Sequence, residues 1–304
     1  MAPLETAGLI CSKLKERDYR GAVLPIEHVA QLKHEIEERL SQKEIDAGLH
    51  ERYLNYFKFD VAASLPRIRS IIITAAPQPQ RKVTFHLNGR TCVVIIPPTY
   101  YADTDDQIKD IIENVLNVDG YQLHRAALPL KLLAVYCGMA KYGKNNITYV
   151  EGQGSFVRLR AYLSDMPPVR SDWLEPQVME ECDSCKACLK ACPTGAIVAD
   201  RFLIHAERCL TFINEGTEEF PEWIDPAWHN SLIGCMRCQV VCPVNKRFIK
   251  WVEEGETFNE TETALILNGV PPDHLPPETV HKLNRSYMVE CLDVLPRNLR
   301  ALMK

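Results

Sequence analysis

Residues 182–193 read CDSCKACLKACP, and this stretch decides how the rest of the chain is organised. Its spacing is C-x2-C-x2-C-x3-C-P, in which three thiolates each bind one iron of a [4Fe-4S] cube and the fourth binds a neighbouring cube. Thiolate suits this task because it is soft and negatively charged enough to hold iron in tetrahedral sulfur coordination. The stretch therefore predicts a second cube in the same chain.

The second site is expected at residues 235–243, which read CMRCQVVCP and repeat part of the spacing. This copy lacks a first cysteine immediately upstream, and Cys209, in ERCL, is the only nearby thiol left to complete the count of eight. We cross the partners between the two motifs, as paired clusters do. The assignment is Cys182, Cys185, Cys188 and Cys242 for one cluster, called cluster A, and Cys192, Cys209, Cys235 and Cys238 for the other, called cluster B.

Structural zinc and disulfides are the alternative uses of these cysteines. C-x2-C pairs occur in zinc ribbons, but a triplet followed by x3-C-P, in two crossed copies, is hard to reconcile with isolated tetrahedral zinc. Disulfides would require adjacent loop cysteines to pair in a chain with no sign of export. Four further cysteines lie in apolar surroundings and are expected to be buried small hydrophobic residues: Cys11, Cys92, Cys137 and Cys291.

The composition is ordinary for a soluble globular chain, with 304 residues, 46% hydrophobic and 25% charged. The formal net charge is -5 and no basic run is present, so nucleic acid is not an expected partner. The alternative is a basic patch that forms only when the chain folds. The N-terminus carries no export signal. The most apolar windows, residues 68–76 and 90–98, are shorter than the ~20 residues of a membrane span and are expected to be buried strands. We therefore expect a cytoplasmic protein with no membrane partner.

Local patterns alternate between helix and strand up to about residue 170. Asn88-Gly89 is the strongest of them, because both residues tolerate positive φ and so predict a hairpin over residues 82–96. His28 and His34 fall on the polar face of the helix expected at 27–40 and are interpreted as solvated. The other expected helices cover residues 1–20, 102–118 and 126–140, and the other expected strands cover 21–26, 68–79, 147–150 and 155–163.

These elements predict an α+β chain with three parts. Residues 1–170 form an α/β cofactor domain, residues 171–250 hold the two clusters, and residues 251–304 form a mostly polar C-terminal extension that packs on the core and closes on a short helix.

The string GMAKYGKNNITYVEGQGSFVRL at 138–159, the two cluster motifs, ERCLTF and the closing LPRNLRALM make the chain resemble the epoxyqueuosine reductase family. The resemblance runs over roughly residues 60–300 and implies that the α/β domain of residues 1–170 is a corrinoid-binding, nitroreductase-like domain, related to that of reductive dehalogenases, that holds base-off cobalamin. It also implies a bacterial ferredoxin-like domain with the eight cysteine ligands assigned above. The residues that match the family's corrinoid-side loops are Gly138, Gly143, Lys144, Asn145, Gly154 and Ser155.

The resemblance departs from the family at the proton donor. Where the family has a proton-donating aspartate, counting back from Gly138 reaches His124, followed by Arg125. A histidine can donate a proton near neutral pH, and the arginine can hold an anion beside it. The alternative is a histidine at a helix start with no catalytic part. Tyr142 and Tyr101 are the other candidate donors, each with the alternative of packing at the edge of a pocket.

The second departure is length, because the family continues into helical repeats that help bind transfer RNA. This chain ends shortly after Arg297-Asn298 and is net acidic, so tRNA epoxyqueuosine is not the expected substrate. We expect a cobalamin-dependent reductase that passes electrons from a donor such as ferredoxin or flavodoxin through both clusters to cobalt. The alternative is an electron-transfer protein or reductive activator of a corrinoid protein partner, with flavin or no cofactor in the α/β domain.

Overall fold

The chain folds into two compact units, called unit 1 and unit 2. The computed structural model describes residues 1–61, 65–100, 103–169, 172–286 and 288–303. Unit 1 comprises Met1–Pro77 and Thr104–Cys185, and unit 2 comprises Gln78–Asp103 and Lys186–Lys304. This division differs from the three predicted parts, because the hairpin belongs to unit 2 and the residues beyond 250 share that unit with most of the cysteine-rich stretch.

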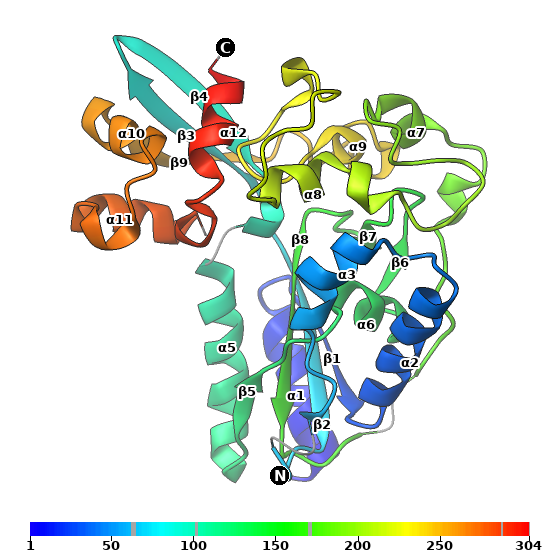
Figure 1. The fold of residues 1–304 in the computed structure, drawn as a ribbon. Coiled ribbons are helices and arrows are strands. Elements are labelled where there is room, and N and C mark those ends of the chain that lie inside the picture. Colours follow the sequence, from blue (N-terminus) through cyan, green and yellow to red (C-terminus); the bar gives the residue numbers. More distant parts are fainter. Residues whose placement is uncertain (62–64, 101–102, 170–171, 287, 304) are drawn as a thin grey trace. The chain divides into compact units, whose positions relative to one another are not determined.

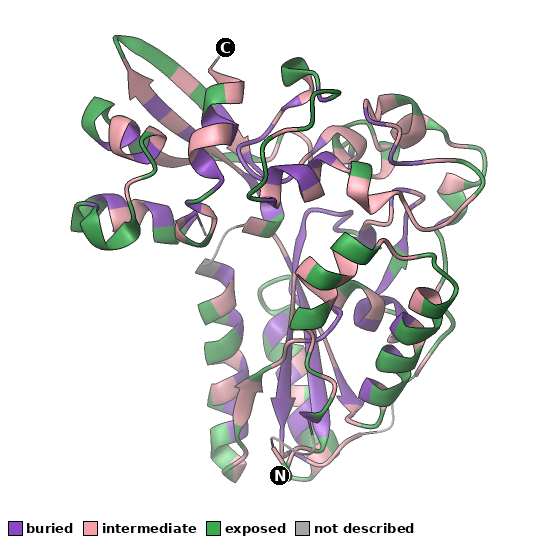
Figure 2. Ribbon diagram, in the orientation of Figure 1, coloured by how far each residue is buried: buried purple, intermediate pink, exposed green. Residues whose placement is uncertain are grey.

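Unit 1 is built on a four-stranded antiparallel sheet with the strand order β1-β2-β8-β5 (Figure 1). The central strands β2 and β8 are buried along most of their length (Figure 2), as the continuous apolar run IIITAA predicts. A separate hairpin, β6-β7, completes the strands of this unit. The strands are β1 (Arg20–Pro25), β2 (Ser70–Pro77), β5 (Leu123–Arg125), β6 (Ala140–Tyr142), β7 (Thr148–Val150) and β8 (Val157–Ser164).

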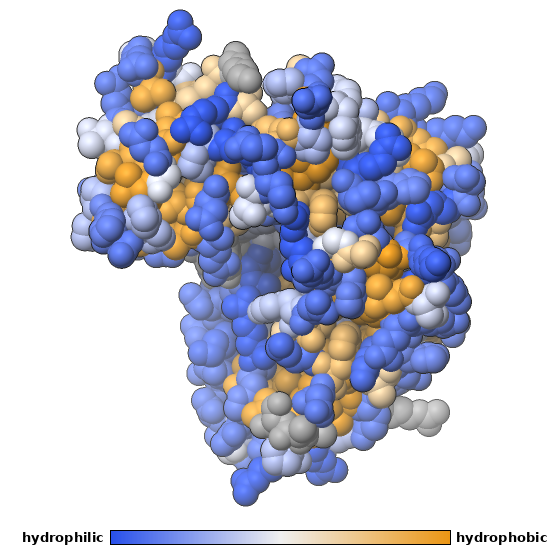
Figure 3. Space-filling view, in the orientation of Figure 1, coloured by the Kyte–Doolittle hydropathy of each residue, from blue (hydrophilic) through white to orange (hydrophobic). Residues whose placement is uncertain are grey.

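Two amphipathic helices, α1 (Pro3–Lys15) and α5 (Asp103–Leu116), pack on one face of this sheet. Ile10 of α1 and Ile108 and Ile112 of α5 join Ile72 of β2 in one buried cluster. The outer face of α5 is hydrophilic (Figure 3), so its stability comes from the buried stripe. The structure also describes three other α-helices in unit 1, namely α2 (His28–Ser41), α3 (Ala47–Tyr53) and α6 (Leu130–Tyr136).

Two predicted helices are shorter than the sequence pattern indicated. The helix expected over 1–20 ends at Lys15, because the chain turns at Asp18, whose φ is 61°, to enter β1. The helix expected over 126–140 is reduced to α6, which starts directly after Pro129. His34 is exposed as predicted, but His28 is half-buried and stacks on Trp173 with ring centroids 3.8 Å apart.

Unit 2 contains the predicted hairpin as part of a three-stranded sheet with the order β4-β3-β9. Asn88 and Gly89 adopt the positive φ values, 51° and 69°, that the turn requires. Strand β9 pairs in parallel with β3 and was not predicted, because its sequence, VEEGETF, is polar. The expectation that residues 90–98 are buried is wrong in part, since Val93 is 50% exposed and Val94 only 4%. The strands are β3 (Gln80–Leu87), β4 (Arg90–Ile96) and β9 (Val252–Phe258).

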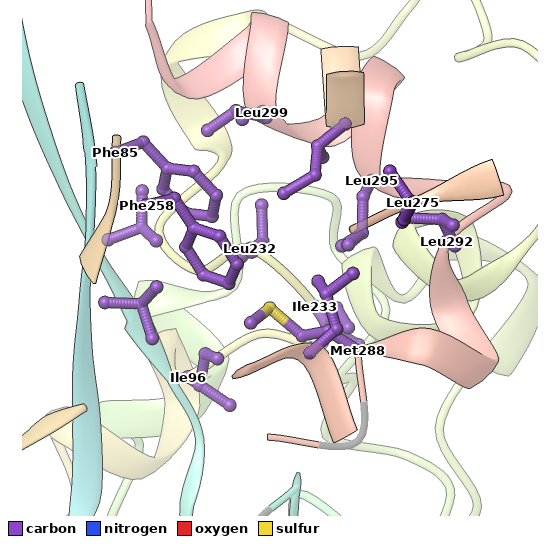
Figure 4. Packing of buried hydrophobic residues seen from close by; sticks show 14 residues of the cluster. Phe85, Ile96, Leu232, Ile233, Phe258, Leu275, Met288, Leu292, Leu295 and Leu299 are labelled. Atoms are coloured by element: carbon purple, nitrogen blue, oxygen red, sulfur yellow. The ribbon is translucent and has the colours of Figure 1, made fainter. Parts of the chain in front are cut away.

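The sheet of unit 2 packs against helices from the C-terminal part of the chain (Figure 4). Phe85 and Phe258 stack with centroids 4.9 Å apart, and Leu232, Leu295 and Leu299 belong to the same buried cluster. The expected polar extension is therefore a folded part of the core. Its helices are α10 (Glu260–Leu267), α11 (Pro277–Arg285) and α12 (Leu295–Leu302). Among the described residues, no helix is both long and apolar enough to cross a membrane.

A buried ion pair ties α10 to α11 in unit 2. Lys282 Nζ lies 2.8 Å from Glu262 Oε1, and Thr279 Oγ1 donates to the same oxygen at 3.1 Å. Glu262 also accepts a hydrogen bond from the backbone N–H of Asn259 at the start of α10. Burial alone would raise the pKa of Glu262, but the hydrogen bonds from Lys282 and Asn259 outweigh burial and lower the pKa below its ordinary value of 4.5.

We predict that Glu262→Gln lowers the stability of unit 2 by about 2–3 kcal/mol at neutral pH, because Lys282 then keeps its largely buried charge with only the exposed Glu278 as an acidic partner. Because folding lowers the pKa of Glu262, its carboxylate stabilises the folded state above pH 4.5, and this stabilisation is lost as the pH falls further. Unfolding measured at neutral pH therefore includes the full effect. Urea unfolding measures the loss. Glu278→Gln is the matched control, since Glu278 pairs with the same lysine but is 79% exposed, and it should cost less than about 1 kcal/mol. Equal midpoints for the two variants would contradict the prediction.

Candidate iron-sulfur centre and cofactor loops

The two cysteine motifs fold in the same way within the chain. Each continues into a short helix, α7 (Ala187–Ala191) or α9 (Arg237–Val240), and each ends in a Cys-Pro pair just beyond it. The two helices pack against each other in unit 2. This repeated arrangement follows from the spacing, because x2 places cysteines in tight loops and x3 spans one helical turn. Cys182 and Cys185 belong to unit 1, and the other six predicted ligands belong to unit 2.

Cys235, predicted for cluster B, lies within electrostatic range of two other cysteines predicted for the same cluster, Cys192 and Cys209. Burial raises the pKa of the Cys235 thiol, and the nearby charge of Cys192 raises it further. Burial likewise raises the pKa of Cys209, with a further contribution from Cys235. Cys209 directly precedes α8 (Leu210–Glu215), so Cys235 interacts with thiols from two segments that are distant from it in sequence. Buried thiols that repel one another when ionised are the donor set that a multi-iron cation stabilises.

Two polar side chains contact these sulfur atoms. Asn230 Nδ2 donates to Cys235 Sγ at 3.3 Å, and the Asn230 Oδ1 atom accepts from the backbone N–H of Met236 at 2.9 Å. Thr194 Oγ1 lies 3.5 Å from Cys192 Sγ. Hydrogen bonds to cluster sulfurs tune reduction potential, so both side chains belong to the candidate site. Neither was predicted, because neither belongs to the cysteine spacing.

Disulfides and a single metal ion are the alternative uses of these cysteines. None of the twelve cysteines is in a disulfide. Within the described parts of the chain, no three Cys, His, Asp or Glu side chains gather around a position for a single metal ion. A cube takes one thiolate on each iron, so its ligands surround a larger group than one zinc ion.

The other four cysteines are half-buried rather than fully buried, in partial agreement with the prediction. Cys11 and Cys137 donate to the backbone carbonyls of Gly21 and Ala134, each at 3.3 Å. Burial raises the pKa of Cys137 to about 11, so its thiol stays protonated at neutral pH. These contacts give Cys11 and Cys137 local structural roles.

The loop between β6 and β7 is shaped by contacts within the protein. A Cβ on Gly143 would meet Asn145 Oδ1 at 2.6 Å and the Tyr149 ring at 2.7 Å, so this position requires glycine. Asn145 Nδ2 donates to the Tyr149 hydroxyl at 3.0 Å, which accounts for the asparagine. Lys144, between them, is half-buried.

Two neighbouring glycines adopt a left-handed backbone conformation, which favours glycine. Gly138 and Gly154 have φ values of 72° and 61°, and Gly154 exchanges backbone hydrogen bonds with Val150. Gly138 is exposed, whereas Ser155 is buried. Of the six predicted corrinoid-side residues, Gly138 and Lys144 are the ones that face outward at least in part.

The candidate proton donors lie in different elements of unit 1. His124 lies in β5, paired with Leu163 of β8, so the expectation of a helix start is wrong. A three-residue strand is defined by its partner rather than by its own pattern, and the sequence therefore missed it. Tyr142 lies in β6 and is buried, and burial raises the pKa of its hydroxyl. Tyr101 lies outside the described residues.

A polar group on α2 and α6 was not predicted at all. The Tyr136 hydroxyl donates to Glu35 Oε2 at 3.1 Å, and Arg39 lies 2.6 Å from the other oxygen of Glu35. Burial and then Glu35 raise the pKa of Tyr136 to about 12. Arg39 and Glu35 also act on the pKa of Tyr142, so this group lies near a candidate proton donor.

Comparison with known proteins finds one matching domain family and several structures with a similar fold. Residues 181–245 match the family described as 4Fe-4S double cluster binding domain. The epoxyqueuosine reductase of Bacillus subtilis is 29% identical over 195 residues, covering 60% of this chain and 49% of that protein. The epoxyqueuosine reductase structure from Streptococcus thermophilus matches with a TM-score of 0.65 at 17% identity, covering 97% of this chain and 80% of that one. An epoxyqueuosine reductase solved with an epoxyqueuosine-modified tRNA stem loop matches with a TM-score of 0.64 at 20% identity, covering 99% and 80%.

These findings first define the class: residues 181–245 are a 4Fe-4S double cluster domain within a mixed α+β fold. Within that class, the chain resembles the epoxyqueuosine reductases, as its motifs predicted. The alignment spans about half the length of the Bacillus subtilis relative, 49% of it. The residue assignments to clusters A and B stay predictions.

We predict that Cys209→Ala loses about half of the bound iron, because one of the two cubes loses a ligand. Iron and acid-labile sulfide counted per chain after anaerobic reconstitution measure the loss. Cys11→Ala is the control, since the Cys11 thiol donates to the backbone carbonyl of Gly21 and is not an assigned ligand. Unchanged iron in Cys209→Ala would mean that the crossed assignment is wrong.

Proposed function

We propose that this chain is an oxidoreductase that relays single electrons through two [4Fe-4S] clusters to a corrinoid held by loops of unit 1. The observation that carries the proposal is the match of residues 181–245 to a double cluster domain, in which the two cysteine motifs fold alike and their helices α7 and α9 pack together. Electron transfer, rather than structural support alone, is supported by the likeness to reductases.

The loops of unit 1 fit a corrinoid in part. Gly143 and Asn145 are explained by their own packing against Tyr149, so they shape the loop rather than contact a ligand. Gly138 offers exposed backbone with no side chain, and Lys144 offers an ammonium donor for amide or phosphate groups. When bound, a corrinoid would supply a low-valent cobalt nucleophile, and the protein's task is to orient it and exclude water.

His124 is our proposed proton donor for the reduction. Histidine is a common general acid in enzymes, and His124 is half-buried on the edge strand β5, beside Arg125. Tyr142 suits this role less well, because burial raises the pKa of its hydroxyl and makes it a weaker acid. Tyr142 is better explained as part of the packed interior of unit 1.

The expected exclusion of tRNA is not supported. The chain shares its fold with a reductase solved with an epoxyqueuosine-modified tRNA stem loop. The argument from chain length also fails, because the matched segment covers only part of the curated relatives.

Modified tRNA is therefore the first substrate to test. Single-turnover reaction of the reduced protein with an epoxyqueuosine-containing stem loop tests it, and unmodified stem loop is the control.

The second candidate function is a reductive activator that passes electrons to a corrinoid protein or another partner. The observation that favours it is His124 at the position of the family's aspartate. Both functions need a low-potential donor, for which we propose a ferredoxin or flavodoxin.

We predict that the anaerobically reconstituted protein retains about one cobalt and about eight irons per chain after incubation with hydroxocobalamin and desalting. Lys144→Gln should weaken cobalt retention without changing iron, since it removes one donor from the loop. Lys141→Gln is the matched control, because Lys141 is exposed on β6 of the same hairpin. Eight irons with no retained cobalt would contradict the corrinoid proposal and favour the activator. Equal cobalt retention by Lys144→Gln and the control would remove Lys144 from the site.

A further inference from the structure

Two adjacent residues of helix α12, Arg297 and Asn298, bind backbone carbonyls in the stretch between Cys209 and Cys235, two cysteines predicted for cluster B. Arg297 Nη2 donates to the carbonyl oxygens of Ile213 and Asn214 at 3.0 and 3.2 Å, and its Nη1 donates to that of Glu218. The guanidinium also lies over the Phe220 ring, with its Cζ atom 4.0 Å from the ring centroid. One cation thus holds the end of α8 and the residues just after it.

Asn298 joins this segment to a second one. Its Nδ2 donates to the carbonyl oxygens of Asn214 at 2.8 Å and Leu232 at 2.9 Å, while its Oδ1 accepts from Arg297. Asn214 Nδ2 in turn donates to the carbonyl oxygen of Gly234 at 2.8 Å. Asn214 and Asn298 are each only 1% exposed, so these bonds are made away from solvent.

The two segments carry two of the thiols predicted for cluster B. The first begins at Cys209, whose carbonyl oxygen accepts from the Ile213 N–H at 3.1 Å in α8. The second ends at Gly234, directly before Cys235. The carbonyls at the end of a short helix lack partners within the helix, so the side chains from α12 satisfy them. The bonds from α12 therefore fix the separation of two segments whose cysteines lie 26 positions apart in sequence.

Apolar packing makes α12 a rigid support for these bonds. Leu295 and Leu299, on the same helix, are fully buried with Leu232 and Ile233 in the core of unit 2 (Figure 4). Gly234 cannot take another residue easily, because its φ is 69° and a Cβ would lie 3.0 Å from the Tyr100 ring. The segment before Cys235 is thus held by packing, by backbone conformation and by hydrogen bonds at once.

We propose that Arg297 and Asn298 are positioning residues for cluster B, holding Cys209 and Cys235 at the separation that one cube requires. The inference rests on the proposed two-cluster function and concerns which residues support one of the two sites. Neither side chain is an assigned ligand, and both act through the backbone of the segments that carry the thiols. Disturbing them should therefore alter cluster B more than cluster A.

The test compares Asn298→Asp with wild-type protein and with a control on the same helix. Aspartate has nearly the same shape but cannot donate to the carbonyl oxygens of Asn214 and Leu232. Arg300→Ala is the control, since Arg300 of α12 also donates to a backbone carbonyl, that of Leu267, which lies outside both cysteine segments. Each reconstituted protein is analysed by iron count, by EPR of the reduced clusters and by redox titration.

We expect Asn298→Asp to lose up to about half of the iron, or to keep the iron with one of two EPR signals and one of two potentials changed. Arg300→Ala should match wild type. Arg297→Lys is the second variant, which keeps the cation but cannot reach three carbonyls at once, and it should change the same signal to a smaller extent. If Asn298→Asp does not fold, Arg297→Lys provides the test of the positioning role instead.

Two results would overturn the inference. Both variants could keep full iron with unchanged EPR signals and potentials, or both could change the two clusters equally. Wild-type protein that takes up far fewer than about eight irons would instead refute the two-cluster function itself.

Discussion

Four thiolates on one cube repel one another until iron is bound, and the protein has to hold them together before the metal arrives. The constraint acts at Cys235, a half-buried thiol whose pKa is raised by burial and also by the nearby Cys192. Bringing like charges into an interior of low dielectric is costly unless a cation compensates them. The packed core of unit 2, which includes Leu232 and Ile233 just before Cys235, offsets this cost by holding the segment in place.

That core explains why the cysteine motifs alone do not make the site. The sheet of β4, β3 and β9 and the helices α10 to α12 form one apolar cluster, which includes Leu232 and Ile233 just before Cys235. Hydrogen bonds from Arg297 and Asn298 then reach the segment that follows Cys209. The C-terminal part of the chain is thus structural support for thiols that lie far from it in sequence.

The sequence predicted those features that depend on local pattern. The Asn88-Gly89 turn requires positive φ, and the cysteine spacing produces the same short helix twice, so both could be read directly. Strand β9 could not, because it is polar and exists through pairing with β3. His124 was placed at a helix start for a similar reason, since β5 is defined by β8. Asn298 acts on residues more than sixty positions away, and no short motif records such contacts.

The central claim is that the eight cysteines hold two [4Fe-4S] cubes, and Mössbauer spectroscopy of the full-length protein reconstituted with Mössbauer-active iron tests it most directly. We predict that essentially all of the iron appears as [4Fe-4S] centres, at about eight irons per chain. Iron in a single cube per chain, in mononuclear sites, or replaced by tightly bound zinc would contradict the account.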